Sequence, residues 1–460
     1  MKKWFVLCLL LGCWLRMDAA GQDASDKMSW FGNAKLGMFI HWGVYSKIAG
    51  VWNGSDQYNE FVMLQAKIPV AEYEKVAATF RPEKMDVEKW VVAAKKAGMK
   101  YVVFTSKHHE GFAMYHSKCS PYNIYDFTGF HRDPLKELAD ACRKHGLKLG
   151  IYYSLGRDWH DPDVPTNWPT KGGRSNTWDY PDEDAKDVNR YMERKAKPQI
   201  RELLEQYHPD LIWFDTFELT PKAQSQAIRK MILDFDPNII INDRIGHGLG
   251  DYRTLEQRES GGIIPGYWEA CITMSKNWGY MKADNDFKSP QKIVGLLIDV
   301  VSKGGNLLLN VGPTPEGTLQ PRNLERLDAL GKWMKANGEA IYGTRPWKVY
   351  GEKSRVAPVA RKAQQSTGFE DAVYDGTTDV VQDIRFTAGD DCVYLFARNW
   401  QDETVVSESL AEKAGKISSV ELLGYRKKLD WQQTAEGLSV RIPRRAVNEL
   451  KTYAFKVKFE

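Results

Sequence analysis

The chain has 460 residues, more than one hydrophobic core usually organises, so we expect one large domain and a smaller one. Its 64 basic and 60 acidic side chains give a formal net charge of +4 without a block of like charge, so neither nucleic acid nor a membrane surface is predicted as partner. The 16 Trp and 21 Tyr residues offer flat apolar rings with polar tips, which suit sugar faces but are also ordinary core material.

The N-terminus predicts export. Two lysines precede an apolar run, residues 4–11, that is too short to span a bilayer, and this arrangement is typical of a secretory signal. We therefore expect residues 1–21 to be a signal peptide and the mature chain to be periplasmic or extracellular, with no transmembrane segment. The residues that end at Cys13 loosely resemble a bacterial lipobox, so a lipid anchor through Cys13 is the alternative.

Four cysteines follow the predicted signal, and none forms a C-x-x-C pair: Cys119, Cys142, Cys271 and Cys392. Cys142 and Cys271 lie inside apolar periodic segments, so we expect them to be small buried hydrophobic residues. The spacing predicts neither a disulfide framework nor a zinc site.

Predicted strands and helices alternate through most of the chain. The first helix, residues 86–97, carries apolar side chains at helical spacing and stops at Gly98. Further helices are predicted at 134–144, 188–207 and 290–302. The eight predicted strands are residues 36–43, 100–106, 147–154, 211–214, 239–244, 252–256, 268–273 and 304–311. This alternation predicts an α/β fold, a (β/α)8 barrel over residues 28–348.

Beyond Trp347 the apolar runs become short and alternate with polar residues. They lie at 380–386, 392–397, 418–423, 438–443 and 452–459. The one candidate helix in this part is short and surrounds Leu410. We therefore expect residues 350–460 to form a C-terminal antiparallel β-sandwich that packs on the barrel and carries no catalytic residues.

Asp215 stands at the end of a short apolar run, residues 211–214, that is typical of a buried strand. A carboxylate at the carboxyl end of a parallel strand lies on the face of an α/β barrel where chemistry is usually done. The alternative interpretation is that Asp215 only caps the next helix.

The ends of the other predicted strands bring polar and aromatic side chains to the same face. They are His41, His108, His109, Tyr152, Arg244, Glu256 and Glu269, with Trp42, Trp213, Trp268 and Trp278 among them. Hydrogen-bond donors and a few carboxylates, flanked by indole rings, are typical of a pocket that binds a neutral, hydroxyl-rich molecule. A sugar is therefore the expected ligand. Glycoside hydrolysis needs one ionised and one protonated carboxyl group, and Asp215 and one of the Glu residues supply such a pair.

Other interpretations of these residues are open. His108 and His109 could ligate a metal, but consecutive strand residues point to opposite faces of a sheet, so we predict no metal. Either histidine could instead be structural. Arg244 could be an ion-pair partner of Asp243, and Trp278 could be ordinary packing.

Seven motifs resemble those of family 29 glycoside hydrolases, the retaining α-L-fucosidases, and occur in the same order. They are Phe39-Ile-His-Trp-Gly43, Lys107-His-His-Glu-Gly-Phe112, Gly150-Ile-Tyr-Tyr-Ser154, Ile212-Trp-Phe-Asp215, Asn242-Asp-Arg244, Trp278-Gly-Tyr280 and Ser302-Lys-Gly-Gly-Asn-Leu-Leu-Leu-Asn-Val-Gly-Pro313. Together they cover essentially the whole predicted barrel. The resemblance implies a catalytic barrel followed by a β-sandwich, no metal or other cofactor, and release of L-fucose from fucosylated glycans with retention.

By this resemblance Asp215 matches the family nucleophile, and Trp213 beside it is expected to line the sugar pocket. The positions that match contacts to fucose are His41, His108, His109, Tyr152, Arg244 and Trp278. Glu60 matches a Glu of the family's Glu-Trp-Tyr segment, although Phe61 and Val62 stand here in place of Trp and Tyr. Glu256 best matches the acid/base, with Glu259, Glu269 and Glu60 as alternatives.

The expected reaction is a double displacement by Asp215 and Glu256, which requires their carboxyl groups to lie roughly 5 to 5.5 Å apart. Two other classes of function are open at this point. One is a related exo-glycosidase acting on a galactose-like sugar, which carries a C6 hydroxyl that fucose lacks. The other is a non-catalytic sugar-binding protein. An apolar wall against the fucose methyl group would favour the fucosidase.

Overall fold

Eight parallel strands form the larger sheet of the computed structural model, which describes residues 19–165, 172–352 and 382–460. They are β1 (Leu36–Ile40), β2 (Tyr101–Lys107), β3 (Lys148–Ser154), β4 (Leu211–Asp215), β5 (Ile240–Ile241), β6 (Arg253–Glu256), β7 (Trp268–Thr273) and β8 (Asn306–Val311). The strand order is β5-β4-β3-β2-β1-β8-β7-β6, and a parallel bridge between Asn242 and Tyr252 links the two edges. The predicted TIM-like barrel is thereby confirmed, with its shortest pairing at the seam between β5 and β6.

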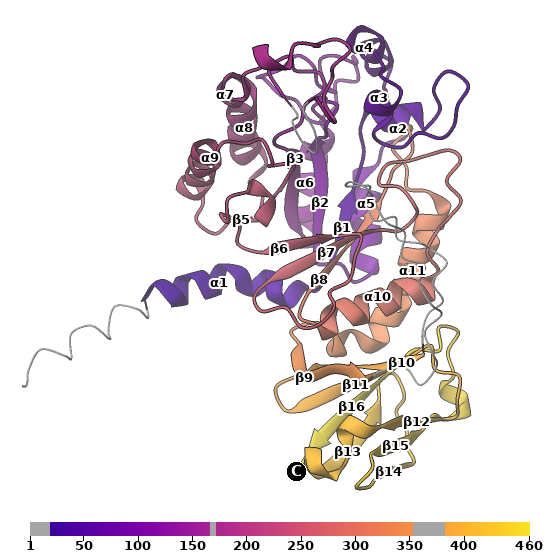
Figure 1. The fold of residues 1–460 in the computed structure, drawn as a ribbon. Helices are drawn as coiled ribbons and strands as arrows, with labels where there is room; N and C mark the ends of the chain where they lie inside the picture. The colour runs from indigo at the N-terminus through magenta and orange to yellow at the C-terminus, as the bar shows by residue number, and fades with distance from the viewer. Residues whose placement is uncertain (1–18, 166–171, 353–381) are drawn as a thin grey trace, which may run out of the picture.

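Helices follow most of the strands (Figure 1). They are α2 (Val44–Ile48), α3 (Val62–Gln65), α4 (Val70–Ala78) and α5 (Val87–Lys96) after β1, α6 (Pro134–His145) after β2, α7 (Val188–Tyr191) and α8 (Lys197–Tyr207) after β3, α9 (Lys222–Phe235) after β4, α10 (Pro290–Ser302) after β7 and α11 (Pro321–Asn337) after β8. Of these, α2, α3 and α4 lie beyond the carboxyl end of β1, and the longer helices cover the outside of the sheet (Figure 1). Both connections that flank β6 are fully described and contain no α-helix, so the predicted alternation of strands and helices fails there. The first of them contains Gly246, Gly248 and Gly250, and glycine is a poor helix former.

Local signals explain how the helices begin and end. The Asp133 side chain accepts a hydrogen bond from the Lys136 backbone N–H at 2.9 Å, which starts α6. Gly146 ends that helix with φ of 70°, a left-handed conformation that favours glycine. The helix predicted over 188–207 is interrupted by a π-helical turn, Met192–Ala196. Pro198 follows this turn and has no N–H to donate to the α-helical ladder, which gives a physical reason for the interruption.

The C-terminal half of α1 (Ala19–Ala34) closes the amino-terminal end of the barrel. Phe31 is buried, and its ring packs on the rings of Tyr101 and Tyr252, with centroids 5.8 and 4.5 Å away. An ion pair of 3.0 Å between Lys27 and Asp251 fixes the helix at its polar edge. The carboxyl end of the barrel is thus left as the open face.

Most of the predicted signal peptide lies outside the described residues, as does Cys13 with its predicted lipid anchor. Only residues 19–21 of the signal are described, at the start of α1. None of the helices in the described part of the chain is long and apolar enough to cross a membrane.

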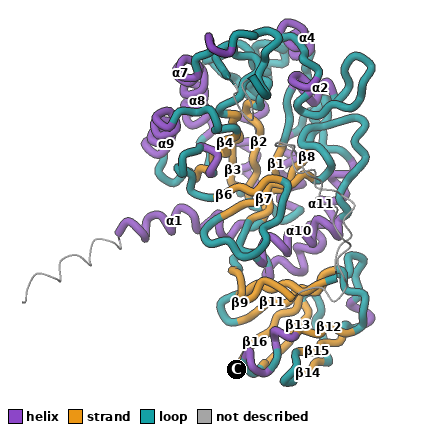
Figure 2. The backbone as a smooth tube through the Cα atoms, viewed as in Figure 1, coloured by secondary structure: helices purple, strands orange, loops and turns teal. Residues whose placement is uncertain are grey.

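The chain continues into two antiparallel sheets (Figure 2), which confirms the predicted C-terminal antiparallel domain. The strands are β9 (Arg345–Glu352), β10 (Asp383–Ala388), β11 (Cys392–Arg398), β12 (Thr404–Ser407), β13 (Ile417–Leu422), β14 (Trp431–Gln433), β15 (Leu438–Arg441) and β16 (Tyr453–Phe459). They form a sheet of order β13-β16-β11-β10-β9 and a second of order β12-β15-β14. Side chains from both sheets, such as Phe386 and Leu395 with Val405 and Leu438, are buried in one shared core.

This part of the chain differs from prediction in its details. β9, β12 and β14 had not been predicted, and residues around Leu410 form two 3₁₀ turns instead of a helix. The β-domain packs on α10 of the barrel (Figure 1). There, Arg398 donates to the Gly295 carbonyl at 2.6 Å and binds both oxygens of Asp383 at 2.6 Å. Arg385 also donates to Asp299 of α10 at 2.8 Å, so buried polar contacts fasten the two parts together.

Candidate active site

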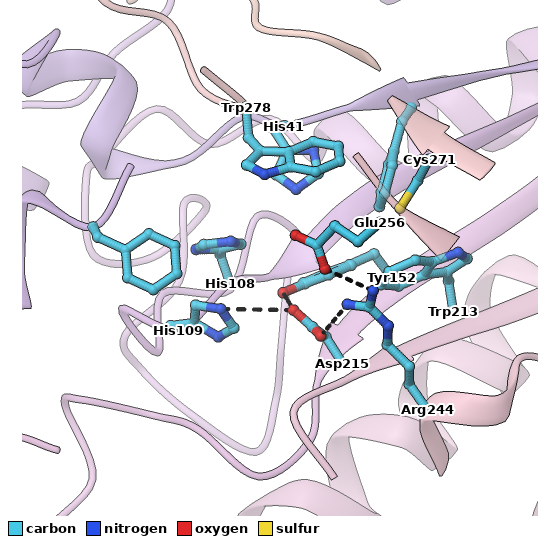
Figure 3. Close-up of a pocket in the computed structure, with 12 residues that line it drawn as sticks. His41, His108, His109, Tyr152, Trp213, Asp215, Arg244, Glu256, Cys271 and Trp278 are labelled. Atoms are coloured by element: carbon cyan, nitrogen blue, oxygen red, sulfur yellow. Dashed lines mark hydrogen bonds and ion pairs between the residues drawn. The ribbon is translucent and has the colours of Figure 1, made fainter. Parts of the chain in front are cut away.

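A small pocket opens at the carboxyl ends of the parallel strands (Figure 3). It is lined by Phe39, His41, Phe61, His108, His109, Tyr152, Trp213, Asp215, Arg244, Glu256, Cys271 and Trp278. Polar side chains and aromatic rings share this lining, as is usual in sites for small molecules. Of the residues matched to the family's nucleophile, acid/base and sugar contacts, all but Glu60 lie in this lining.

The parallel sheet explains why these side chains meet. Asp215 is the last residue of β4, Glu256 is the last residue of β6, and Tyr152 lies near the end of β3. Arg244 lies in a 3₁₀ turn, Asp243–Ile245, directly after β5. Because all the strands run in the same direction, their carboxyl ends converge on one rim even though these residues are far apart in sequence.

The Asp215 carboxylate is held on both oxygens. Oδ1 accepts hydrogen bonds from Arg244 Nη1 at 2.8 Å and from the Thr216 backbone N–H at 2.9 Å. Oδ2 accepts one from the Tyr152 hydroxyl at 2.9 Å and lies 3.6 Å from His109 Nε2. Burial favours a higher pKa for Asp215, but the charge and hydrogen bond of Arg244, together with Arg157 and Tyr152, hold the pKa below its ordinary value. Asp215 is therefore ionised at neutral pH.

Arg244 also binds the second carboxylate of the pocket. Its Nη2 donates to Glu256 Oε2 at 2.6 Å (Figure 3). The guanidinium carbon, Cζ, lies 4.8 Å from the centroid of the Trp213 ring. The two terminal nitrogens of a guanidinium are about 2.3 Å apart, so the bound oxygens of Asp215 and Glu256 lie within roughly 8 Å of each other. The Glu256 side chain is 28% exposed and that of Asp215 is 16% exposed, so Glu256 lies nearer the solvent.

His108 and His109 both reach the pocket, with ring centroids 4.2 Å apart. The expectation that they point to opposite faces is wrong, because β2 ends at Lys107 and strand alternation no longer applies to the residues beyond it. His109 Nδ1 lies 2.6 Å from the Ser154 hydroxyl, whereas His108 Nδ1 is buried without a hydrogen-bond partner. Burial, aided by neighbouring positive groups, lowers the pKa of both imidazoles well below the usual value. They are neutral at pH 7.

His41 completes the polar side of the pocket. Its Nδ1 lies 2.7 Å from Asn310 Oδ1, and the Asn310 amide donates to the Trp278 carbonyl at 2.8 Å. The His41 ring packs beside the Trp278 indole at 4.9 Å between centroids. Burial lowers the pKa of His41 to about 4, although Asn310 and Asp215 oppose the shift. Asn310 on β8 thus holds one histidine and one tryptophan of the pocket together.

The other candidate acids lie outside the pocket lining. Glu60 is buried and accepts a hydrogen bond from the Gly279 backbone N–H at 3.2 Å, next to Trp278. Glu269 lies inside the barrel, where it accepts hydrogen bonds from Tyr101 and Trp213 at 2.6 and 2.9 Å. Burial raises the pKa of Glu269 to about 7.

Glu259 faces the β-domain instead of the pocket. It is hydrogen-bonded to Asp299 of α10, and burial together with the Asp299 charge raises the pKa of Glu259 to about 7. Among the four glutamates considered as acid/base, Glu256 is the one that lines the pocket.

Sequence analysis missed three residues that line the pocket: Phe39, Phe61 and Cys271. Phe39 lies two residues before His41, so strand periodicity places both on the same face and could have identified it. Cys271 is buried as predicted, but its side chain reaches the pocket. Phe61 comes from a loop and carries no periodic signal; its ring lies 5.3 Å from that of His109.

Two tryptophans predicted on this face lie elsewhere. Trp42 packs on Phe80 and Trp90 in the core, with ring centroids 5.5 and 5.2 Å away. Trp268 is the first residue of β7, so it lies at the amino end of that strand, where its indole donates to the Lys303 carbonyl at 3.3 Å.

Asp243 does not hold Arg244 by a direct ion pair. Arg244 pairs with Asp215 and Glu256, and it reaches Asp243 through Thr254.

Across the three described ranges of the chain, no cluster of His, Cys, Asp and Glu has the arrangement of a metal site.

Comparison with known proteins assigns the chain to a family. A family model described as Alpha-L-fucosidase matches residues 16–339, and one described as Alpha-L-fucosidase C-terminal domain matches residues 377–460. The chain belongs to the alpha-L-fucosidase family, glycoside hydrolase family 29. Its overall sequence supports this assignment, because it is 31% identical to an alpha-L-fucosidase of Branchiostoma floridae over 473 residues, covering 97% of this chain and 96% of the relative.

Solved structures of the family share the architecture. Alpha-L-fucosidase isoenzyme 1 from Paenibacillus thiaminolyticus matches with a TM-score of 0.79 and 31% identity, covering 95% of this chain and 99% of that one. Alpha-L-fucosidase AlfC from Lactobacillus casei, solved in complex with its α-L-fucose product, is 38% identical with a TM-score of 0.64, covering 68% of this chain and 99% of that one. The match to full-length relatives includes the C-terminal β-domain, and the family is that of a glycoside hydrolase with fucosidase activity.

Proposed function

We propose that the chain is an exo-acting, retaining α-L-fucosidase in which Asp215 is the nucleophile and Glu256 the acid/base. The observation that carries the proposal is that one guanidinium, Arg244, binds both carboxylates inside the pocket. Retaining glycosidases place the two carboxyl groups about 5 to 5.5 Å apart, and inverting ones about 6.5 to 9.5 Å apart. The shared guanidinium holds the bound oxygens within roughly 8 Å, a limit that includes the retaining separation, and retention itself is proposed from membership of glycoside hydrolase family 29.

In the first step, an ionised Asp215 oxygen attacks the anomeric carbon of the fucoside. The bond from this carbon to the aglycone oxygen breaks, and Glu256 gives its proton to the departing oxygen. The products are a glycosyl ester on Asp215, a free aglycone alcohol and an ionised Glu256. Arg244 suits this exchange because its charge stabilises whichever of the two carboxyl groups is ionised.

In the second step, ionised Glu256 removes a proton from a water molecule that has taken the place of the aglycone. The water oxygen attacks the anomeric carbon, and the ester bond to Asp215 breaks. Two inversions at the same carbon give net retention, and both carboxyl groups return to their starting protonation states. The greater exposure of Glu256 suits a group that must meet both the aglycone and water.

The rest of the pocket supports a neutral sugar as ligand. Because His41, His108 and His109 are neutral, they offer hydrogen-bonding nitrogens to hydroxyl groups without adding a charge; the Nδ1 of His41 donates to Asn310, which leaves its Nε2 as an acceptor. The buried Nδ1 of His108 without a partner is a polar atom that such a hydroxyl can satisfy. Phe39 and Phe61 supply apolar wall area, which suits the C6 methyl group of fucose better than the hydroxymethyl group of a galactose-like sugar.

The proposed substrate class is a terminal α-L-fucosyl glycan. A structure of AlfC contains Fuca(1,6)GlcNAc, which supports a fucosylated saccharide as the substrate here. The charged and apolar segments at the N-terminus support export, so we place the proposed activity in the periplasm or outside the cell.

The proposal is tested by incubating the wild-type chain with 4-nitrophenyl α-L-fucopyranoside and following the first anomer released by NMR. Release of α-L-fucose is expected, and release of the β-anomer would contradict retention. A panel of fucosylated oligosaccharides accompanies the aryl substrate, because an enzyme that requires a glycan can ignore an aryl group. The matching α-L-galactoside tests the galactose-like alternative, and no turnover of any substrate would favour a sugar-binding protein.

Azide distinguishes the roles of the two carboxyl groups. Asp215→Gly with azide should yield the β-fucosyl azide by a single inversion, whereas Glu256→Ala with azide should yield the α-fucosyl azide through the intact nucleophile. Asp140→Ala, which removes an exposed carboxylate on α6, is the control and should keep wild-type activity. The opposite assignment of the two azides would reverse the proposed roles.

A further inference from the structure

The seam of the barrel lies directly below the carboxylate pair. β5 has two residues and joins the β6 side through the bridge between Asn242 and Tyr252, whereas β3 and β4 pair along five positions. The connection between β5 and β6 contains no α-helix to pack against this seam. Yet Arg244 on one side and Glu256 on the other must keep a fixed relation for the guanidinium to bind both carboxylates. Side-chain contacts across the seam must therefore supply the rigidity that the strand ladder lacks.

Three side chains form such a connection. Asp243 Oδ1 accepts hydrogen bonds from Thr254 on β6, from the hydroxyl at 2.6 Å and from the backbone N–H at 3.1 Å. The same hydroxyl accepts a hydrogen bond from Arg244 Nε at 3.1 Å. The Thr254 hydroxyl donates to Asp243, so its lone pairs are directed to Arg244. Nε is thus fixed, while Nη1 and Nη2 remain available for Asp215 and Glu256.

The fold supports this arrangement in two further ways. Thr254 precedes Glu256 by two residues on β6, so strand periodicity places both side chains on the same face. Gly250 passes close to the Asp243 backbone, where an added Cβ would lie 2.5 Å from the Asp243 nitrogen. The chain therefore requires glycine at this point to bring β6 against the turn that carries Arg244.

We propose that Thr254, held by Asp243, is a positioning residue that fixes the Arg244 guanidinium as the bridge between Asp215 and Glu256. The role of Thr254 rests on the proposed function of the two carboxyl groups. It acts through Arg244 and makes no contact with the reacting atoms.

Loss of this connection has a specific consequence for the nucleophile. The titratable groups that interact with Asp215 are Arg244 after β5, Tyr152 on β3, Arg157 after β3, His108 and His109 after β2, His41 after β1 and Cys271 on β7. Arg244 contributes the strongest of the interactions that lower the Asp215 pKa. If Arg244 loses its Nε anchor and samples other rotamers, the pKa of Asp215 rises. The acidic limb of the kcat/KM profile, which reports ionisation of the nucleophile, then moves to higher pH.

The test is the Thr254→Val variant of the full chain, which removes the hydroxyl with little change in volume. With the aryl fucoside we expect kcat/KM to fall about tenfold, the change associated with loss of one hydrogen bond, and the acidic limb to rise by about half a pH unit. Thr254→Ser restores a hydroxyl and should return both values toward wild type. The matched control is Thr387→Val in β10, which also removes a buried strand hydroxyl, one that donates to the Ala340 carbonyl at 2.8 Å.

Thr387→Val should lower the melting temperature without moving the pH profile. If Thr254→Val behaves in the same way as this control, the positioning role is wrong. If Thr254→Val does not fold by circular dichroism, Asp243→Asn replaces it, since it keeps the Thr254 hydroxyl but removes the charge that holds it. An unmoved acidic limb in that variant would also overturn the proposal. A wild-type chain that releases no fucose would contradict the proposed function instead, so the two failures are distinguishable.

Discussion

Replacing Arg244 with Lys would test the bridge between the two carboxylates while keeping the positive charge. The guanidinium donates to Asp215 at 2.8 Å and to Glu256 at 2.6 Å, through two nitrogens of a rigid planar group. A lysine ammonium is a single point charge and cannot reproduce both bonds in this geometry. At least one charge-assisted hydrogen bond is lost, which costs about 1.5–3 kcal/mol. We therefore expect kcat/KM to fall about 10- to 150-fold.

The same variant should change the pH dependence of the reaction. Arg244 opposes the effect of burial on Asp215 and lowers its pKa, so weaker contact raises that pKa. The ionised fraction of the nucleophile then falls at low pH, and the acidic limb of kcat/KM moves upward. Steady-state kinetics with the aryl fucoside across a pH series measure both effects. Arg143→Lys on α6, where the arginine pairs with exposed Asp140, is the control and should match wild type.

Activity of Arg244→Lys within about threefold of wild type, with an unmoved acidic limb, would refute the reasoning. It would mean that the bridge seen between the two carboxylates contributes little to the transition state.

Three further outcomes are expected. Glu60→Ala frees the Gly279 backbone N–H beside the pocket, so KM for the fucoside should rise roughly tenfold with little change in kcat; unchanged KM would contradict this role. Glu269 keeps its proton in the folded state between pH 4.5 and about 7 but loses it when unfolded, so stability should fall as pH rises through this window. Urea unfolding at several pH values should show a flatter dependence for Glu269→Gln, and parallel curves would exclude the effect. Arg398→Ala removes two charge-assisted hydrogen bonds from buried Asp383, which keeps its ion pair with Arg385, and should cost about 1.5–3 kcal/mol of stability in a thermal or denaturant melt, while kcat/KM at 25 °C stays within about twofold.

The barrel could be predicted because its strands are short apolar runs that end in polar residues. β4 and β7 match their predicted ranges closely, and both are buried along most of their length. The antiparallel domain was also recognisable from its alternating runs. Its β12 and β14 have four and three residues, too short for the period of two to be distinguished from loop sequence.

The connections on either side of β6 show where periodicity carries no information. The sequence predicted that helices and strands alternate, but glycines and turns fill the connection after β5. Pairing between β5 and β6 depends on contacts between residues that neither strand reveals by itself. The seam, and with it the role proposed for Thr254, follows only from the three-dimensional arrangement.

The candidate site was largely predictable because parallel strands bring their carboxyl ends together whatever the loops do. Asp215 and Glu256 are the last residues of their strands, which explains why the prediction placed them in one pocket. Glu269 shows the limit of the same reasoning, since it is the second residue of β7 and lies deeper in the barrel. Phe61 shows another limit, because a loop residue has no periodicity that assigns it to a face.

The two histidines after β2 were correctly predicted to lie at the site, but the orientation predicted for their side chains was wrong. His108 and His109 were expected to point apart, yet both reach the pocket because the strand has already ended. Burial then makes both imidazoles neutral. Their burial and charge state depend on the surrounding aromatic side chains, which no local pattern in the sequence specifies.

Covalent trapping of the nucleophile tests the central claim most directly. A 2-deoxy-2-fluoro-L-fucosyl fluoride carries a good leaving group and a fluorine that slows hydrolysis of the glycosyl enzyme, so the ester intermediate should accumulate. Mass spectrometry of the intact chain should show one added deoxyfluorofucosyl group, and peptide mapping should place it on Asp215. A label on another residue, or turnover with inversion and no label at all, would contradict the account.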